Sequence, residues 1–319
     1  MKKWSAEMGV AFVFPGQGSQ IVGMGEKLAE NFPSARAVFE EVDDALGEKL
    51  SKIIFQGPED LLTLTANTQP ALMAVSMALL RVMEEQGFVL KNKVNFLAGH
   101  SLGEYCALCA GGSFSIRDTA RLLRIRGAAM QSAVPVGKGA MAALIGLEEE
   151  VVEQICLEAS KEGVCQIAND NGAGQIVISG EKNAVEWSAK AASDKGAKRS
   201  VILPVSAPFH SVLMQPAAKA MEEAFEQVEK KDSMVDIIPN VSVTPEKEIK
   251  KLVPLLVEQV TGRVRWRETV EWFAKNDIKH IYEIGSGKVL TGLIRRIDKS
   301  INTKNINDIE TMEAALQEL

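Results

Sequence analysis

Short apolar runs alternate with longer amphipathic segments along most of this chain. The runs at 10–14 and 94–98 are continuous and apolar, as expected for strands buried on both faces. Each run ends in a glycine-rich turn. Strands alternating with helices predict an α/β domain built on a central, mostly parallel sheet.

Apolar residues at helical spacing predict the helices of this domain. Ser115 is expected to cap one helix, and Asn67 and Thr68 are cap candidates for another. The helices are expected at 24–31, 34–46, 69–85, 102–110, from the Ser115 cap to 132, and at 212–229, 246–259, 266–275, 287–297 and 308–318. Further strands are expected at 236–243 and 279–284.

The pattern changes after Pro135. Strands are expected at 140–145, 164–168, 175–179 and 198–203, with helices at 148–161 and 182–193. The resulting order, βαββαβ, is typical of a ferredoxin-like unit. We therefore expect a small subdomain at 134–204, inserted into a large α/β domain made of 1–133 and 205–319.

Composition and charge narrow the class of protein. The 319 residues are 46% hydrophobic and 24% charged, which is ordinary for a globular protein. The net charge of −6 argues against a general affinity for nucleic acid. The start, Met1 to Trp4, lacks the apolar core of a leader, and the most apolar helical segment, 71–83, is interrupted by Arg81. We expect a cytoplasmic protein that does not enter a membrane.

Two of the four cysteines, Cys106 and Cys109, form a C-x-x-C motif. Zinc would need two further ligands at similar spacing, and the sequence offers none. The pair lies in a small, apolar, helical run. We interpret both as helix packing and expect no metal site.

The segment Gly99-His100-Ser101-Leu102-Gly103 fits the pattern G-x-S-x-G between a predicted strand and a predicted helix. In that context the glycines permit a sharp turn that exposes the serine hydroxyl at the head of a helix. The helix N-terminus would favour negative charge on a reacting oxygen. The sequence predicts a nucleophile at Ser101; an ordinary glycine-flanked turn is the alternative.

A serine nucleophile needs a base, and the chain has three histidines. His100 adjoins Ser101 and is expected to point away, lining the pocket or packing. His280 lies in a predicted strand and is expected to be structural. His210 follows a strand and a Pro-Phe turn, where α/β folds present catalytic groups. By elimination His210 is the predicted base.

Several ordered motifs resemble one family. They are Phe14-Pro15-Gly16-Gln17-Gly18-Ser19-Gln20, then Gly99-His100-Ser101-Leu102-Gly103-Glu104-Tyr105, Arg126-Gly127-Ala128-Ala129-Met130-Gln131, Asn169-Asp170-Asn171, Pro208-Phe209-His210-Ser211, and Gln259 before Val264-Arg265-Trp266. This set, spread over residues 9–295, resembles the bacterial malonyl-CoA:acyl carrier protein transacylases. The resemblance implies a hydrolase-like α/β domain with a ferredoxin-like insertion.

The resemblance also implies roles for single residues. Ser101 resembles the acyl-accepting nucleophile, His210 its base, and Gln259 the residue whose carbonyl orients the imidazole. The N–H groups of Gln17 and Leu102 resemble an oxyanion hole. Residues expected to bind substrate are Arg126, which resembles the anchor of the malonyl carboxylate, together with His100, Met130, Asn169, Asn171 and Phe209.

Plainer explanations remain open for five of these residues. Arg126 could belong to a solvated helix face with Arg121 and Arg124. Gln17 could be a turn residue, and Phe209 could pack in the core. Asn169 and Asn171 could form a hairpin.

The implied reaction is a ping-pong transfer of malonyl from malonyl-CoA to the phosphopantetheine thiol of acyl carrier protein. Neither a resident cofactor nor nucleic acid is expected, and we expect a monomer. Carrier proteins are acidic, so a basic rim is predicted from Arg263, Arg265, Arg267, Lys198 and Arg199.

Two rival functions are considered. One is a serine thioesterase or hydrolase, which is disfavoured because residues 198–209 contain no acid that could orient the histidine; the other is a non-catalytic docking module. A polyketide pathway would use the same chemistry.

Overall fold

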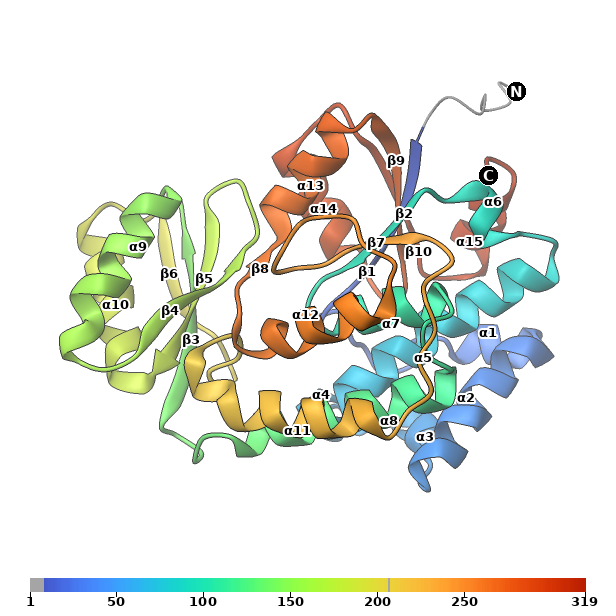
Figure 1. Cartoon of the computed structure of the whole chain (residues 1–319), viewed down its shortest axis with the longest axis horizontal. Helices are drawn as coiled ribbons and strands as arrows, with labels where there is room; N and C mark the ends of the chain where they lie inside the picture. Colours follow the sequence, from blue (N-terminus) through green and yellow to red (C-terminus); the bar gives the residue numbers. More distant parts are fainter. Residues whose placement is uncertain (1–8, 206) are drawn as a thin grey trace.

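The structure, a computed structural model, describes residues 9–205 and 207–319. The prediction that the chain lacks a leader rests on Met1 to Trp4, and these residues lie outside the described ones. The central sheet has the order β10-β9-β1-β2-β7, and all four neighbouring pairs are parallel (Figure 1). Its strands are β1 (Gly9–Phe14), β2 (Phe96–Gly99), β7 (Asp236–Ile238), β9 (Ile278–Ile284) and β10 (Asn302–Ile306). The predicted central parallel sheet is confirmed.

Strand β1 is buried on both faces, which explains its continuous apolar sequence. Phe12 and Phe14 pack into one apolar layer, whereas Ala11 and Val13 pack into another. The first layer is built largely by helices α2 (Pro33–Leu46), α5 (Thr65–Glu85), α7 (Leu102–Ala110), α8 (Ile116–Ser132), α11 (Gln215–Glu226) and α12 (Ile249–Thr261). The second is built by α13 (Trp266–Lys275) and α14 (Val289–Ile297).

Several short elements were not predicted from the sequence. Helices α3 (Leu50–Gln56), α4 (Glu59–Thr63) and α6 (Leu90–Lys93) have one or two turns, too few for a clear helical period. Strand β10 is a polar edge strand, N-T-K-N-I, with little of the apolar signal expected of a strand. Helices α1 (Glu26–Asn31) and α15 (Ile309–Leu316) match predicted segments.

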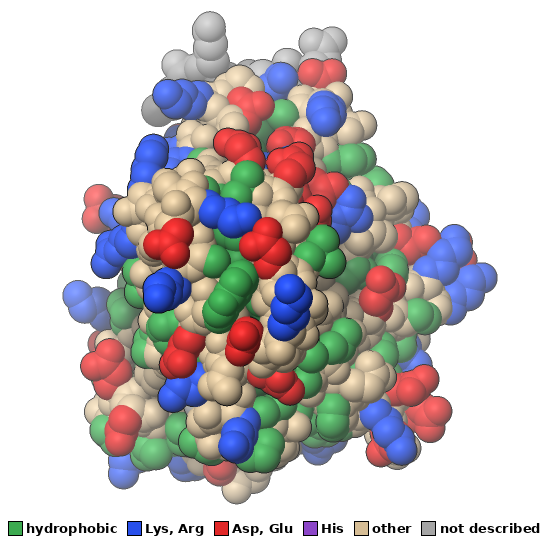
Figure 2. Space-filling view, turned by 90° about the vertical axis from the view of Figure 1, so that its left-hand side faces the viewer, with side chains coloured by type: hydrophobic (Ala, Val, Ile, Leu, Met, Phe, Trp, Pro, Cys, Tyr) green, Lys and Arg blue, Asp and Glu red, His purple; other side chains and the backbone are tan. Residues whose placement is uncertain are grey.

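A second sheet has the order β6-β3-β5-β4, with antiparallel neighbours. Its four strands and two neighbouring helices follow one another along the chain as β3 (Gly139–Ile145), α9 (Glu149–Glu158), β4 (Cys165–Asp170), β5 (Gln175–Glu181), α10 (Lys182–Asp194) and β6 (Arg199–Ile202). Both helices pack on this sheet around a separate apolar core (Figure 1). Figure 2 shows that cations and anions are interspersed on the face formed by α9 and α10.

This second sheet extends beyond residues 134–204. Strand β8 (Val264–Arg265) pairs in parallel with β4 and adds a fifth strand. The small sheet is thus completed by residues from the C-terminal part of the chain, a pairing between distant segments that local patterns do not reveal. The division into two domains stays a prediction.

The expected helix caps have different outcomes. Ser115 caps α8, because its Oγ accepts a hydrogen bond from the Asp118 N–H at 3.0 Å. Asn67 and Thr68 lie inside α5, which begins at Thr65, so the prediction that they cap it is wrong. Their side chains instead donate to the carbonyls of Leu61 and Leu62 in the preceding segment. Among the described helices, none is both long and apolar enough to span a bilayer.

Replacing the α8 cap should measurably destabilise the protein. We expect Ser115→Ala to lower the free energy of unfolding by about 1 kcal/mol, since one N–H of the first turn loses its acceptor. Urea unfolding measures this change, with Ser132→Ala, at the exposed last residue of α8, as the control. Equal effects from both substitutions would contradict the capping role.

Candidate active site

The carboxyl ends of three parallel strands meet at one edge of the central sheet. Gln17 follows β1, Ser101 follows β2 and Asn240 follows β7. This edge is where open α/β sheets bind ligands. A cavity of about 290 Å³ lies here, and the predicted site residues that line it are Gln17, His100, Ser101, Leu102, Arg126, Met130, Asn169, Asn171, Phe209 and His210.

The turn at Ser101 is sharp and strained. Ser101 has φ 54° and ψ −111°, a conformation that non-glycine residues rarely adopt. A Cβ at Gly99 would lie 1.9 Å from the carbonyl carbon of Gly103, and one at Gly103 would lie 2.2 Å from the Phe14 oxygen. Both glycines of the motif are therefore required by close backbone approach, which lets the serine side chain stand at the head of α7.

The predicted base lies in contact with the predicted nucleophile. The Ser101 Oγ and the His210 Nε2 are 2.8 Å apart. On the other side of the ring, Nδ1 lies 2.9 Å from the Gln259 carbonyl oxygen and 3.1 Å from that of Gly262. Because carbonyls only accept, Nδ1 carries the proton and Nε2 is left to accept from the serine. The structure brings Ser101, His210 and Gln259 together as expected.

The environment keeps His210 neutral. Burial, with the charge of Arg126 as the second cause, lowers the pKa of the imidazole to about 3. The carbonyls of Gln259 and Gly262 act in the opposite direction. An unprotonated imidazole is the form that can take a proton from a serine hydroxyl.

Arg126 is buried, with only 1% of its surface exposed, so the alternative of a solvated helix face is wrong. Its Nη1 donates to the Gln69 Oε1 at 2.9 Å. Its Nη2 donates to the Ser101 Oγ at 3.1 Å and to the Gln259 Oε1 at 2.8 Å. The helical period of the sequence indicates this burial, because Arg126 lies on the same face of α8 as the buried Leu123 and Met130.

The expected oxyanion hole lies at the same edge. Leu102 is the first residue of α7, so its N–H has no acceptor within the helix. Gln17 lies in the turn after β1, and its side-chain Nε2 donates to the Thr65 Oγ1 at 3.3 Å. Both residues line the cavity. Their role towards an oxyanion stays a prediction.

The remaining predicted residues form the walls of the cavity. The His100 Nε2 lies 2.9 Å from the Asn171 Oδ1, which links the turn after β2 to the turn after β4. Asn171 also shapes the β4–β5 hairpin, since its N–H donates to the Gln175 carbonyl. Met130 and Phe209 close the apolar side.

Three polar residues of the site were not predicted: Gln69, Glu104 and Asn240. Glu104 is fully buried, and its Oε2 accepts from the Asn240 N–H at 2.9 Å and the Gln259 Nε2 at 2.8 Å. Burial raises its pKa to about 7, although both hydrogen bonds and the charge of Arg126 act the other way. A glutamate in a first helical turn is common, so only its burial distinguishes it.

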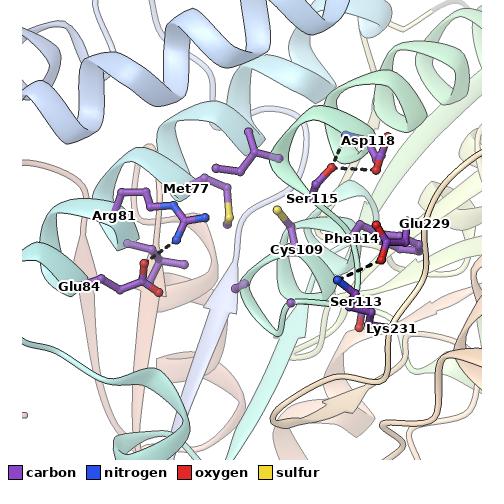
Figure 3. Close-up of a pocket in the computed structure, with 14 residues that line it drawn as sticks. Met77, Arg81, Glu84, Cys109, Ser113, Phe114, Ser115, Asp118, Glu229 and Lys231 are labelled. Atoms are coloured by element: carbon purple, nitrogen blue, oxygen red, sulfur yellow. Dashed lines mark hydrogen bonds and ion pairs between the residues drawn. The ribbon is translucent and has the colours of Figure 1, made fainter.

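A second pocket, of about 260 Å³, lies between α5 and the connection from α7 to α8 (Figure 3). Four of its five charged side chains form local ion pairs, Arg81 with Glu84 and Lys231 with Glu229, and the fifth, Asp118, accepts from the Ser115 hydroxyl. Burial raises the pKa of Cys109, which lines this pocket, to about 11 and that of Cys106 well above its usual range. Both thiols are therefore unreactive at neutral pH, in line with helix packing.

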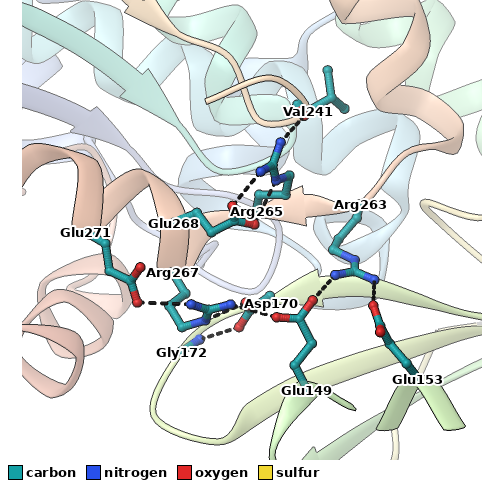
Figure 4. Close-up of polar contacts among 10 residues, drawn as sticks. All are labelled: Glu149, Glu153, Asp170, Gly172, Val241, Arg263, Arg265, Arg267, Glu268 and Glu271. Carbon is teal, nitrogen blue, oxygen red and sulfur yellow. Dashed lines mark hydrogen bonds and ion pairs between the residues drawn. The ribbon is translucent and has the colours of Figure 1, made fainter. Parts of the chain in front are cut away.

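Three arginines of the predicted basic rim are paired with carboxylates (Figure 4). Arg263 pairs with Glu149 and Glu153, Arg265 with Glu268, and Arg267 with Asp170, Glu149 and Glu271. Their charge is thereby offset, and the pairs join β8 and α13 to α9 and β4. The geometry therefore does not support a basic rim formed by these three side chains.

Comparison with known proteins identifies close relatives. Residues 11–304 match the acyl transferase domain family. The malonyl CoA-acyl carrier protein transacylase of Bacillus subtilis is 43% identical over 97% of each chain. The corresponding Escherichia coli K12 protein is 42% identical over 96% of this chain and 98% of its own.

Solved structures agree with this fold. A crystal structure of acyl-carrier-protein-S-malonyltransferase from Bartonella henselae has a TM-score of 0.96 and 65% identity, covering 97% of this chain and 99% of its own. A malonyl-transacylase in complex with its type II PKS acyl-carrier protein has a TM-score of 0.94 and 41% identity, covering 98% of this chain and all of its own.

The low pKa of His210 can be measured directly. We expect ¹⁵N NMR of the labelled histidines to show His210 still neutral at pH 5, because lowering the pKa keeps the deprotonated form present at more acidic pH. His210→Asn identifies its resonances among the three histidines. A midpoint between pH 6 and 7 would contradict the burial argument.

Proposed function

This chain belongs to the acyl transferase domain family, and we propose that it moves malonyl from malonyl-CoA to the phosphopantetheine thiol of an acyl carrier protein. The observation that carries the proposal is the environment of a single hydroxyl. The Ser101 Oγ lies 2.8 Å from the His210 Nε2 and 3.1 Å from the Arg126 Nη2. A nucleophile, its base and a carboxylate-binding cation thus meet at one point.

In the first half-reaction, Ser101 attacks the thioester carbonyl while His210 takes the hydroxyl proton. The carbonyl oxygen becomes negatively charged, and we assign its stabilisation to the N–H groups of Gln17 and Leu102. Each such donor contributes about 3 kcal/mol in comparable sites. The protonated imidazole then gives its proton to the departing coenzyme A sulfur, leaving a malonyl ester on Ser101.

In the second half-reaction, the carrier thiol replaces coenzyme A. His210 takes the thiol proton as the sulfur attacks the ester, and it returns that proton to the Ser101 oxygen as the ester breaks. The carbonyl partner of His210 fixes the ring without placing another anion next to an anionic acyl group. The same groups therefore serve both directions of the transfer.

Arg126 accounts for selection of a dicarboxylic acyl group. Its planar guanidinium can bind a carboxylate through two parallel hydrogen bonds, which lysine cannot reproduce. A bound carboxylate also offsets the positive charge that lowers the pKa of His210. Substrate binding thus makes the imidazole a stronger base when it is needed.

We assign this transfer to fatty acid synthesis; the names of the relatives specify malonyl CoA and acyl carrier protein and are compatible with that pathway. A polyketide pathway is the alternative, since one similar structure contains a type II PKS carrier. The route uses no resident cofactor. We infer that a monomer suffices, because every residue of the proposed site comes from one chain.

The acyl-enzyme can be trapped. Brief incubation with malonyl-CoA should add one malonyl group to Ser101, detected by mass spectrometry of the intact protein and its peptides. Ser101→Ala should show no adduct. With carrier protein present the malonyl group should move to the carrier; rapid release of free malonate without transfer would favour a hydrolase.

Arg126 should determine the choice of acyl donor. We expect Arg126→Ala to lower kcat/KM for malonyl-CoA by at least about 100-fold, as for loss of a buried charge pair, with a much smaller effect on residual acetyl transfer. Arg121→Ala, an exposed arginine on the same helix, is the matched control. Equal losses on both donors would argue against a carboxylate anchor.

A further inference from the structure

Beneath the catalytic groups lies a buried carboxylate to which the transfer mechanism assigns no role. We propose that Glu104 is a positioning residue that acts on Arg126 through Gln259: it balances the guanidinium charge in the empty site and becomes protonated when the malonyl carboxylate takes over that balance. The inference rests on the proposed malonyl transfer. It concerns a residue that contacts neither substrate nor the reacting atoms.

The charge of Arg126 has no directly bonded counter-ion in the part of the chain that the structure describes. Arg126 is 1% exposed, and its hydrogen-bond partners are the Gln69 amide, the Ser101 hydroxyl and the Gln259 amide. Among the described residues, no carboxylate forms an ion pair with it. A buried cation needs a nearby anion, because burial otherwise strongly disfavours its charged form. Glu104, fully buried and one amide group away, is that anion.

The Gln259 side chain is oriented by the charges on its two sides. Its Nε2 donates to the Glu104 Oε2 at 2.8 Å, and its Oε1 accepts from the Arg126 Nη2 at 2.8 Å. A flipped amide would place its NH₂ against the guanidinium and its oxygen against the carboxylate. The two charges therefore fix this amide, and the amide in turn fixes one edge of the guanidinium.

Glu104 also supports the catalytic turn itself. Its Oε2 accepts from the Asn240 N–H, and the Asn240 side chain binds both sides of the strained turn. The Asn240 Oδ1 accepts from the Ser101 N–H at 2.9 Å, and its Nδ2 donates to the Gly99 carbonyl at 2.7 Å. Gln259 meanwhile holds His210 through its main-chain carbonyl. The Glu104 carboxylate is thus linked through Asn240 to the nucleophile, and through Gln259 to the base and to the carboxylate anchor.

Binding of malonyl changes the charge balance. The empty site holds one buried cation, Arg126, and one buried anion, Glu104. A malonyl carboxylate at Arg126 adds a second anion, and like charges in a buried site favour protonation of one of them. The other ionisable groups packed nearby are Tyr105, His100 and His210, and they stay neutral near pH 8 because burial raises the pKa of Tyr105 and lowers that of both histidines.

The proton comes from solvent and is held on Glu104, with no other bond made or broken. Burial already raises the pKa of this carboxyl to about 7 in the empty site. At pH 8 it is therefore mostly ionised before binding and available to accept a proton. Its Oε1 is buried without a hydrogen-bond partner, which leaves that oxygen open for the proton.

The test measures protons taken up on binding. Titration calorimetry at pH 8 in two buffers of different ionisation enthalpy should show uptake approaching one proton per chain when malonyl-CoA binds the Ser101→Ala protein, which cannot react. Acetyl-CoA, which lacks the carboxylate, is the matched ligand and should show none. Adding Glu104→Gln, which keeps a hydrogen-bond acceptor but removes the charge, should abolish the uptake.

Infrared difference spectroscopy of the Ser101→Ala protein gives a second measurement that needs no change at Glu104. Malonyl-CoA should produce the carbonyl stretching band of a protonated, buried carboxyl group, and acetyl-CoA should not. Malonyl-CoA binding without proton uptake, or with equal uptake after Glu104→Gln, would overturn this inference alone. Failure of malonyl-CoA to bind at all would instead count against the proposed function.

Discussion

The structure of the site depends on one buried cation. Arg126 lies on the inner face of α8, where its guanidinium contacts Ser101, the proposed nucleophile, and the side chain of Gln259. A guanidinium in such a place is costly unless hydrogen bonds and a counter-charge compensate it. The surrounding amides and Glu104 supply that compensation while the cavity is empty. We propose that an acyl group with a free carboxylate supplies it when the cavity is filled.

This arrangement also explains why strain is tolerated at the proposed catalytic residues. Ser101 and His210 both have positive φ, at 54° and 56°, in a chain where glycine occupies most such positions. Strained residues of this kind persist only when their surroundings fix them. Asn240 holds the Ser101 turn from below, and the carbonyls of Gln259 and Gly262 hold the imidazole. Rigid positioning of this kind lowers the reorganisation needed during acyl transfer.

Much of the fold could be predicted because its central strands are buried on both faces. The apolar runs that form β1 and β2 are followed directly by the turns that contain Gln17 and Ser101. Predicting the strands therefore also predicted the position of the site. The polar edge strand β10 and the two-residue β8 were missed, since their pairing depends on distant segments. The resemblance to malonyl-CoA:acyl carrier protein transacylases is confirmed by the family match and by relatives of nearly equal length.

Within the site, residues in distinctive motifs were predictable, whereas those recognised only by burial were not. Ser101 stands in a glycine pattern and His210 after a Pro-Phe turn, but Glu104 and Asn240 become notable only once the fold removes them from water. A crystal structure of the malonyl-enzyme would test the roles proposed for Ser101 and Arg126 most directly. We expect an ester on the Ser101 Oγ with its free carboxylate hydrogen-bonded to the Arg126 guanidinium. An ester on another residue, or a carboxylate turned towards solvent away from Arg126, would contradict these roles.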